Sequence, residues 1–215
     1  MHSRRVTTVT VTAVLVLVAT LAGCGSHKSP PPPGSAASSA PASGTTPATG
    51  AGTPEPQETN PPGDIPDSTA FVPYRPSSGQ FEIKVPEGWA RTTSGDAVSF
   101  TDKLNTVRVQ TVAAASAPTV DSARTTEVPA IQAAARRFSL TKVEVVKRRA
   151  GDAVLVTYRA DSAVDPVTNK VVPDAVERYE FWKSGTEAVV TLSGPVNADN
   201  VDPWRTVTDS FRWLA

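Results

Sequence analysis

The sequence predicts an α+β fold, in which an antiparallel sheet of about six to seven strands is flanked by two helices as an α/β/α sandwich. Three observations lead to this prediction. Several short segments alternate apolar and polar residues, as half-buried strands do. Glycines and short turns separate most of them, and strands joined in this way pair antiparallel. Two other stretches have helical spacing, and their apolar stripes need a sheet face each or one shared face.

Order is expected to begin near residues 69–74, and the first predicted strands follow at 81–85, 98–100 and 107–111. In each strand the residues alternate in polarity with a period of two. A Pro-Glu-Gly turn ends the first strand, and a short turn joins the second to the third. These three strands should therefore form a small antiparallel group.

A helix is predicted between Pro118 and Phe138, where the apolar period lengthens to that of a helix. It either starts late or is kinked at Pro129, because proline removes a backbone N–H. Arg136 and Arg137 suit the negative end of the helix dipole. The residues at helical spacing are Val128, Ile131, Ala135 and Phe138.

Strands return after this helix, at residues 143–145, 153–160, 176–183 and 188–193. Glycines separate most of them, and a long polar loop over 161–173 joins two of them. A second helix closes the chain. Its apolar stripe consists of Trp204, Val207, Phe211 and Leu214. Asn200 is placed to cap that helix, and Pro203 is tolerated in its first turn.

The N-terminus resembles the leader of a bacterial lipoprotein. Arg4 and Arg5 precede an apolar run over 6–22, which ends at Leu21-Ala22-Gly23-Cys24, the site of the single cysteine. In the lipobox that this segment resembles, the chain is cut before the cysteine, which then carries lipid. A permanent membrane-spanning helix is the alternative, but the run contains threonines and is shorter than the about 20 apolar residues that a span needs. We predict a signal peptide at 1–23 and leave the export route, Sec or twin-arginine, open.

The predicted lipidated cysteine opens a tether at residues 24–66 that is rich in Pro, Gly, Ser and Thr. Such a segment cannot bury enough apolar surface to offset its conformational entropy, so disorder is expected. Glycosylation of its threonines is an alternative reading of the same composition. The folded domain is predicted at 67–215. Two or more acyl chains on Cys24 make a stable anchor, so we expect attachment to the outer face of the cell membrane.

The segment from Phe81 to Trp89 resembles the opening of the Mog/PsbP-like domains, with an aromatic residue, an alternating strand, a proline and Gly-Trp. Ser210-Phe211 is similar to the way in which such domains end. The family includes actinobacterial lipoproteins of the LpqN type. The resemblance implies an α/β/α sandwich that binds partners or supports larger complexes, and it implies no catalytic residues.

Composition excludes several kinds of chemistry. No histidine follows His27 and no cysteine follows Cys24, so the folded part has no imidazole or thiol for nucleophilic catalysis or for a zinc site. No phosphate-binding loop is present. The 21 basic and 21 acidic residues balance, which argues against nucleic acid as a partner. We therefore expect no cofactor and no catalytic residue.

The remaining acids lie on or beside the long loop. Asp161, Asp165 and Asp174 could gather around calcium, which prefers oxygen ligands. Their spacing matches no calcium loop, and loop acids are usually only solvated. We expect no metal site. A pair of glycosidase carboxylates among such acids stays open, because the sequence does not give their separation.

Five residues are candidates for contact with a ligand or partner. Trp89 and Trp182 could stack on a sugar, although burial in the core or under a helix is the favoured explanation of both. Lys147, Arg148 and Arg149 could meet anionic headgroups or an acidic wall polymer, or be a solvated strand end.

Three functions fit these observations. The first is a non-catalytic binding or scaffolding lipoprotein of the cell envelope, whose partners are envelope proteins. The second is a carrier that holds a lipid or other apolar ligand between sheet and helix. The third is a hydrolase that uses only carboxylates, for which two buried acids in one cleft would be the structural signature.

Overall fold

A computed structural model describes residues 61–165 and 167–214. The predicted signal peptide, the lipidation site Cys24 and residues 24–60 of the predicted tether lie outside the described residues. The strands are Phe71–Tyr74 (β1), Phe81–Pro86 (β2), Ala90–Ser94 (β3), Ala97–Asp102 (β4), Asn105–Ala113 (β5), Ser139–Arg148 (β6), Gly151–Asp161 (β7), Pro173–Lys183 (β8), Thr186–Pro195 (β9) and Arg212–Trp213 (β10). The helices are Val120–Ser122 (α1), Ala123–Glu127 (η1, a π-helix), Val128–Ala134 (α2) and Val201–Ser210 (α3).

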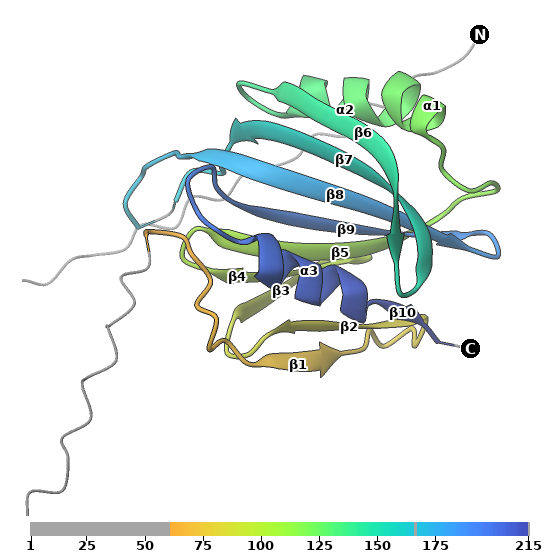
Figure 1. Cartoon of the computed structure of the whole chain (residues 1–215), viewed down its shortest axis with the longest axis horizontal. Helices are drawn as coiled ribbons and strands as arrows, with labels where there is room; N and C mark the ends of the chain where they lie inside the picture. The colour runs from red at the N-terminus through yellow and green to blue at the C-terminus, as the bar shows by residue number, and fades with distance from the viewer. Residues whose placement is uncertain (1–60, 166, 215) are drawn as a thin grey trace, which may run out of the picture. The chain divides into compact units, whose positions relative to one another are not determined.

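The strands form two antiparallel sheets (Figure 1). The larger has seven strands in the order β3-β4-β5-β9-β8-β7-β6, and the smaller has three in the order β1-β2-β10. The predicted α+β class with an antiparallel sheet is confirmed. The prediction placed strand 81–85 with the next two strands, whereas β2 belongs to the smaller sheet.

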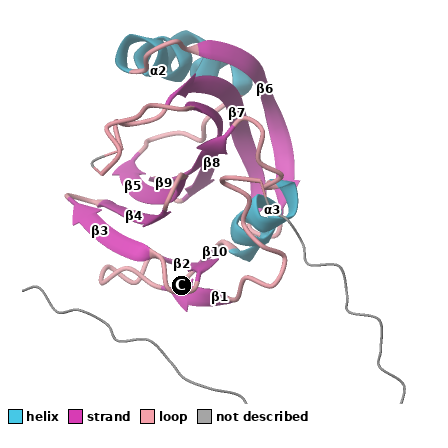
Figure 2. Cartoon of the chain, turned by 90° about the vertical axis from the view of Figure 1, so that its left-hand side faces the viewer, coloured by secondary structure: helices cyan, strands magenta, loops and turns pink. Residues whose placement is uncertain are grey.

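Helices cover both faces of the seven-stranded sheet (Figure 2). On one, the α3 face, α3 and the smaller sheet pack against the larger sheet. On the other, the α2 face, α1, η1 and α2 pack against β6 and β7. Alternate residues of β7 serve the two faces, since Ala153 and Leu155 belong to the first core, and Val154 and Val156 to the second. The structure thus gives each predicted helical region its own sheet face.

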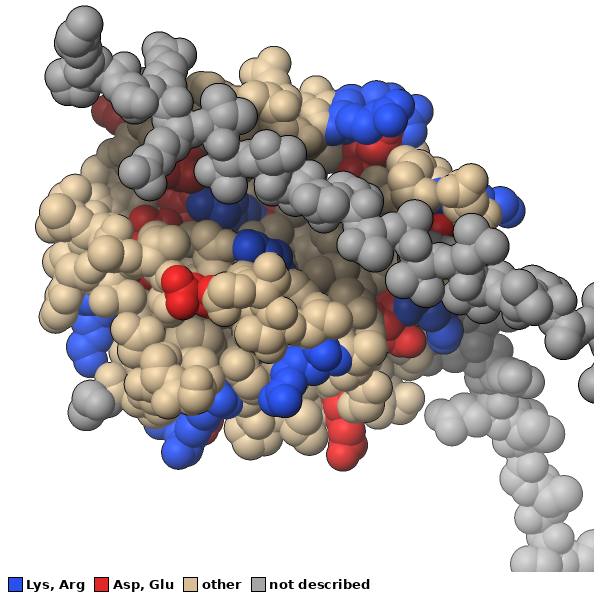
Figure 3. Space-filling view, turned by 180° about the vertical axis from the view of Figure 1, so that it is seen from behind, with Lys and Arg blue, Asp and Glu red and all other residues tan. Residues whose placement is uncertain are grey.

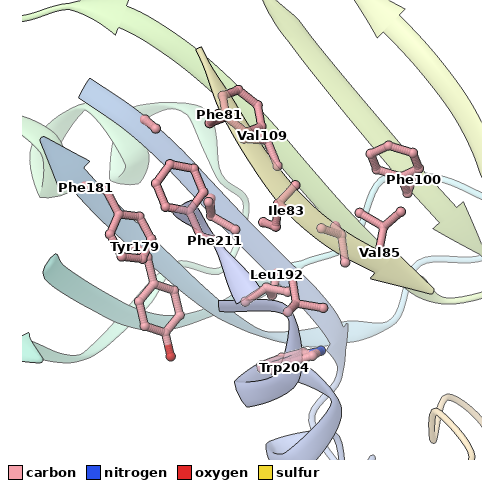
Figure 4. Packing of buried hydrophobic residues seen from close by; sticks show 14 of the residues in the cluster. Phe81, Ile83, Val85, Phe100, Val109, Tyr179, Phe181, Leu192, Trp204 and Phe211 are labelled. Atoms are coloured by element: carbon pink, nitrogen blue, oxygen red, sulfur yellow. The ribbon is translucent and has the colours of Figure 1, made fainter. Parts of the chain in front are cut away.

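The core of the α3 face is closely packed with aromatic rings. Figure 4 shows Phe211 between Phe181 and Phe81, with ring centroids 4.5 Å and 5.5 Å away, respectively. Ile83 and Leu192, both fully buried, lie close by. The space between α3 and the larger sheet is therefore filled by side chains, so the ligand position expected for a carrier is occupied.

The first helical region differs from its prediction at both ends. It begins at Val120, because Thr119 and Ser122 form a capping box, and passes through the π turn before Pro129, which lies in the first turn of α2. Proline is tolerated there because an N–H in the first turn of a helix has no acceptor within that helix. The helix stops at Ala134, and Ala135 is extended. The predicted extension to Phe138 is wrong; this residue precedes β6 and packs against Tyr158.

The final helix also ends earlier than predicted. It stops at Ser210, and Phe211 turns the chain so that Arg212 and Trp213 pair with β2. Leu214 is therefore not on the helix; its backbone N–H donates to Gln80.

Asn200 stands at the N-cap position of α3 but its side chain does not cap the helix. Its Oδ1 accepts a hydrogen bond from the backbone N–H of Ile65 (2.9 Å), and its Nδ2 donates to Gly63 O (3.1 Å) and Asn105 Oδ1 (3.0 Å). Ile65 is 5% exposed and belongs to the core. Residues 63–65, assigned to the tether from sequence, are thus held by the folded part.

Candidate functional site

A cavity of about 700 Å³ lies beneath residues 162–172, the segment that joins β7 to β8. We call it the loop cavity. Its other walls come from the β4–β5 turn and from neighbouring ends of β8 and β9. The loop contributes Val164 and Val172, the β4–β5 region contributes Leu104 and Thr106, and β8 and β9 contribute Asp174 and Ser193. The cavity therefore combines aliphatic side chains and hydroxyl groups with two lysines and two acids, of which Asp174 is the buried one.

Hydrogen bonds within the loop hold one side of this cavity. Oδ1 of Asp165 accepts from the backbone N–H groups of Val167 (3.0 Å) and Thr168 (2.6 Å). The bonds from Thr168 lower the pKa of Asp165 below its usual value. Ser162 and Val172 close the base of the loop through two hydrogen bonds. Asp165 is thus engaged in shaping the loop.

Asp174 is the buried acid in the cavity wall. It is 6% exposed, and no described residue donates a hydrogen bond to its Oδ1. Burial, together with the smaller effect of the neighbouring charge of Asp161, raises the pKa of Asp174 to about 6. Asp161 is itself bound by the guanidinium of Arg137. A buried carboxylate without a donor of its own is uncommon, because its desolvation is not compensated.

The three acids considered as possible calcium ligands have separate roles. Asp161 pairs with Arg137, Asp165 binds its own loop, and Asp174 is buried in the cavity wall. Across residues 61–165 and 167–214, no three His, Cys, Asp or Glu side chains are grouped so as to hold a metal ion.

A second buried acid, Glu180, lies on the α2 face. It is 1% exposed, and its Oε1 accepts from Arg178 Nε (3.0 Å), while Arg178 also pairs with Glu127 of η1 (3.1 Å). The pKa of Glu180 is raised to about 7. Burial is the largest cause, the charges of Glu187 and Glu127 act in the same direction, and Arg178 partly opposes the increase. Figure 3 views this face, where acidic and basic side chains lie together in a recess of the surface.

The two buried acids are too far apart to act as a hydrolytic pair. Asp174 and Glu180 are six residues apart on β8, and a strand rises about 3.3 Å per residue, so their backbones are about 20 Å apart. Paired glycosidase carboxylates are separated by less than about 10 Å. These two acids therefore belong to separate sites.

The two tryptophans singled out from the sequence lie in different places. Trp89 is half-buried against the α3-face core, and it lines a cavity of about 590 Å³ next to residues 61–70. Trp182 is half-buried on the other face, and its Nε1 donates to the backbone oxygen of Ala114 (2.9 Å). They do not form one aromatic platform, and their roles as contacts stay predictions.

The basic triplet is split by the strand geometry. Arg148 points inward, where it donates to the Tyr179 hydroxyl (2.8 Å) and to Thr208 Oγ1 (3.1 Å) of α3. Lys147 and Arg149 are exposed, and Arg149 lines an open groove beside α3. The structure therefore leaves two of the three for contact with an anionic surface.

Sequence reasoning did not single out the buried state of Asp174 or Glu180. The signal was present in the alternation of β8, which places both acids on the same face as Val176. Asp174 was considered only as a loop acid, because β8 begins three residues earlier than predicted.

No protein-family profile and no curated protein sequence matches the chain. Solved structures similar to it include the Ran-binding protein Mog1p of Saccharomyces cerevisiae, at 9% identity and a TM-score of 0.48, covering 67% of this chain and 96% of that one. Cyanobacterial PsbP (CyanoP) of Synechocystis sp. PCC 6803 is similar at 17% identity and 0.48, covering 68% and 94%. LpqN of Mycobacterium tuberculosis, involved in cell envelope biogenesis, is similar at 11% identity and 0.41, covering 69% and 93%. These neighbours are Mog1, PsbP and LpqN proteins, and the Phe81–Trp89 segment resembles the opening of Mog/PsbP-like domains. At such identities and scores the likeness carries no information on function.

In the described part of the chain, no helix has the length and apolar character required to span a bilayer.

Proposed function

We propose that this chain is a non-catalytic binding module of a bacterial cell envelope. In this proposal lipid on Cys24 anchors it to the extracytoplasmic face of the cell membrane, and the bacterium is an actinobacterium. The binding role rests on the loop cavity, whose wall contains a buried carboxylate without a hydrogen-bond donor. The anchoring role rests on the segment Leu21-Ala22-Gly23-Cys24, and the LpqN-type assignment on Phe81–Trp89.

Two observations favour binding over catalysis. The folded part contains no histidine or cysteine, so a nucleophile there would have no imidazole partner. The buried acids Asp174 and Glu180 stand on one strand about 20 Å apart, and so do not share a cleft. A cavity with one buried acid and several aliphatic side chains suits recognition of a ligand more than its hydrolysis.

A carrier of an apolar ligand is the second candidate function. The aromatic packing around Phe211 leaves no room for such a ligand between α3 and the sheet. The loop cavity supports this candidate instead, because Leu104, Val164 and Val172 provide apolar walls. The carrier would then hold its ligand at the end of the sheet.

Anchoring is tested by labelling with a fatty-acid analogue. The wild-type chain should incorporate the label and start at Cys24 by mass spectrometry, while Cys24→Ala should not incorporate it. Ser26→Ala, which keeps the cysteine, is the matched control and should be labelled. A wild-type chain that takes up no label would rule out the lipid anchor.

Binding is tested by nuclear magnetic resonance of the full chain against a mixed set of small fragments. At least one chemical class should shift the amide signals of residues that line the loop cavity. Exposed residues at the opposite end of the sheet strands, such as Asp152 of β7, serve as the internal control. If no class shifts the lining residues selectively, the cavity is not the binding site of this module.

A further inference from the structure

We propose that the loop cavity binds a small amphipathic monoamine, with the protonated amino group against the Asp174 carboxylate and the aliphatic body against Leu104, Val164 and Val172. This inference rests on the proposed function, because it names the ligand class for the same cavity.

The first step is the charge of Asp174. Asp174 is 6% exposed as a residue, and its Oδ1 has no donor among the described residues. The neighbouring charge that acts on it is a second acid, Asp161, whose own partner is Arg137. A buried acid beside another acid favours a ligand that brings positive charge and hydrogen-bond donors.

The second step is the choice of an ammonium group over a metal ion. Calcium takes six to eight oxygen ligands, several of them usually carboxylates. Asp161 and Asp165 are engaged by Arg137 and by the loop, so Asp174 is the acid that remains for a ligand. An ammonium group has three donors and needs only one carboxylate with nearby neutral acceptors.

Hydroxyl groups supply these acceptors. Thr106 and Ser193 are cross-strand partners, and both line the loop cavity. Ser193 is also paired with Val176, two residues along β8 from Asp174, so that strand alternation places all three polar side chains on one face. The cavity wall therefore combines the Asp174 carboxylate with the hydroxyl oxygens of Thr106 and Ser193.

The third step concerns the remainder of the ligand. Val164 is 56% exposed, and together with Leu104 and Val172 it gives the cavity an apolar part of its wall. Covering these side chains with an aliphatic group removes apolar surface from water. Lys103 and Lys170 also line the cavity and disfavour a second positive charge. A monoamine with an alkyl body satisfies these conditions, whereas a polyamine does not.

The test compares three probes of equal chain length, n-butylamine, butan-1-ol and butyrate, on the isotopically labelled full chain. Butylamine should shift the amide signals of the cavity-lining residues, with an affinity about tenfold or more above that of the alcohol. Asp174→Asn should weaken butylamine binding by a similar factor. Asp152→Asn removes an exposed acid of β7 outside the cavity and should change nothing.

A pH titration of the wild-type chain keeps the test informative if Asp174→Asn does not fold. Butylamine binding should weaken as the pH falls through about 6, where Asp174 takes up a proton. If the alcohol or butyrate binds the cavity as well as the amine, the amine assignment is overturned while the proposed function stands. If none of the three probes binds the cavity but other fragments do, the amine assignment is likewise overturned and the proposed function stands. If nothing binds the cavity, the amine assignment and the proposed function are both wrong.

Discussion

At the scale of single residues, Arg148 shows how a side chain in a basic run becomes part of the core. Its guanidinium carbon lies 4.9 Å from the centroid of the Tyr179 ring, and its nitrogens donate to the Tyr179 hydroxyl and to Thr208. Asp209 of α3 lies 3.8 Å from Nε. The sequence displays three adjacent cations, but strand alternation turns the middle one toward the helix-covered face.

We expect Arg148→Ala to destabilise the protein by about 2 kcal/mol, because it leaves the partly buried Tyr179 and Thr208 groups without their charged donor. Arg149→Ala, at the exposed neighbouring position, should change the free energy of unfolding by less than about 0.5 kcal/mol. Urea unfolding measures both. Equal effects of the two substitutions would mean that Arg148 does not hold α3 to the sheet.

Glu180 makes stability depend on pH with a defined sign. The pKa of Glu180 is raised by burial from 4.5 to about 7 in the folded state, so the folded protein binds more protons than the unfolded chain between these values. The stabilisation of the folded state by proton binding to Glu180 is therefore complete below about pH 4.5 and is lost as the pH rises through about 7. Asp174 acts in the same direction.

Wild-type stability should accordingly fall on going from about pH 5 to about pH 8, with a contribution from Glu180 on the order of 2 kcal/mol. Glu180→Gln should remove much of this pH dependence and leave the part due to Asp174. Glu87→Gln, at an exposed turn, is the matched control. Thermal unfolding across this pH range measures the effect, and an unchanged slope in Glu180→Gln would contradict it.

At the scale of elements, Asn200 joins the segment before β1 to the start of α3. Its side chain makes three hydrogen bonds, to Ile65, Gly63 and Asn105, and Asn105 Nδ2 also donates to Gly63 O (2.8 Å). Gly194 is needed beside this cluster, since a Cβ there would lie 2.4 Å from Asn105 Oδ1. A backbone segment without regular secondary structure is thereby fixed to the core.

Asn200→Ala should cost about 1–3 kcal/mol, because it leaves the backbone N–H of Ile65 and the Oδ1 of Asn105 unsatisfied, while Gly63 O keeps its bond from Asn105. The backbone amide of Ile65 should lose protection from hydrogen exchange more than amides of the central strands. The exposed Asn197→Ala is the control and should leave both quantities unchanged. Retained protection of Ile65 would show that its side-chain burial alone holds the segment.

The elements found from sequence are those with a strong apolar period. β5 buries alternate side chains, and β4, β7, β8 and β9 each contain adjacent buried residues, so most strands of the larger sheet could be predicted. β3 was missed because all of its residues are exposed, β1 because it contains a proline, and β10 because it has only two residues. Pairing with a neighbour, and not their own pattern, makes these segments strands.

At the scale of the whole molecule, the loop cavity could not be predicted because its walls come from segments far apart in sequence. Leu104, Val164 and Ser193 meet there only because β5 pairs with β9 and β9 with β8. The relation of Asp174 to Asp161 likewise depends on the pairing of β7 with β8. Composition did predict which catalytic groups the folded part lacks, since that needs no knowledge of contacts.

The two core clusters should unfold together, because they share β7. Removing the cluster around Val154 and Val156 would expose the strand that also carries Ala153 and Leu155 of the other cluster. Unfolding in urea should therefore be a single transition that coincides for tryptophan fluorescence and far-ultraviolet circular dichroism. Trp182 and Trp204 report from opposite faces of the larger sheet, so fluorescence samples both.

The same experiment separates folding from anchoring. Cys24 lies 39 positions before Gly63, whose backbone oxygen accepts bonds from Asn105 and Asn200, so Cys24→Ala should have the wild-type urea midpoint even though it takes up no lipid. Both chains are compared in the same detergent, with Ser26→Ala as the control. Two separate transitions would mean that the α2-face cluster unfolds on its own. A shifted midpoint in Cys24→Ala alone would mean that the lipid contributes to the stability of the folded part.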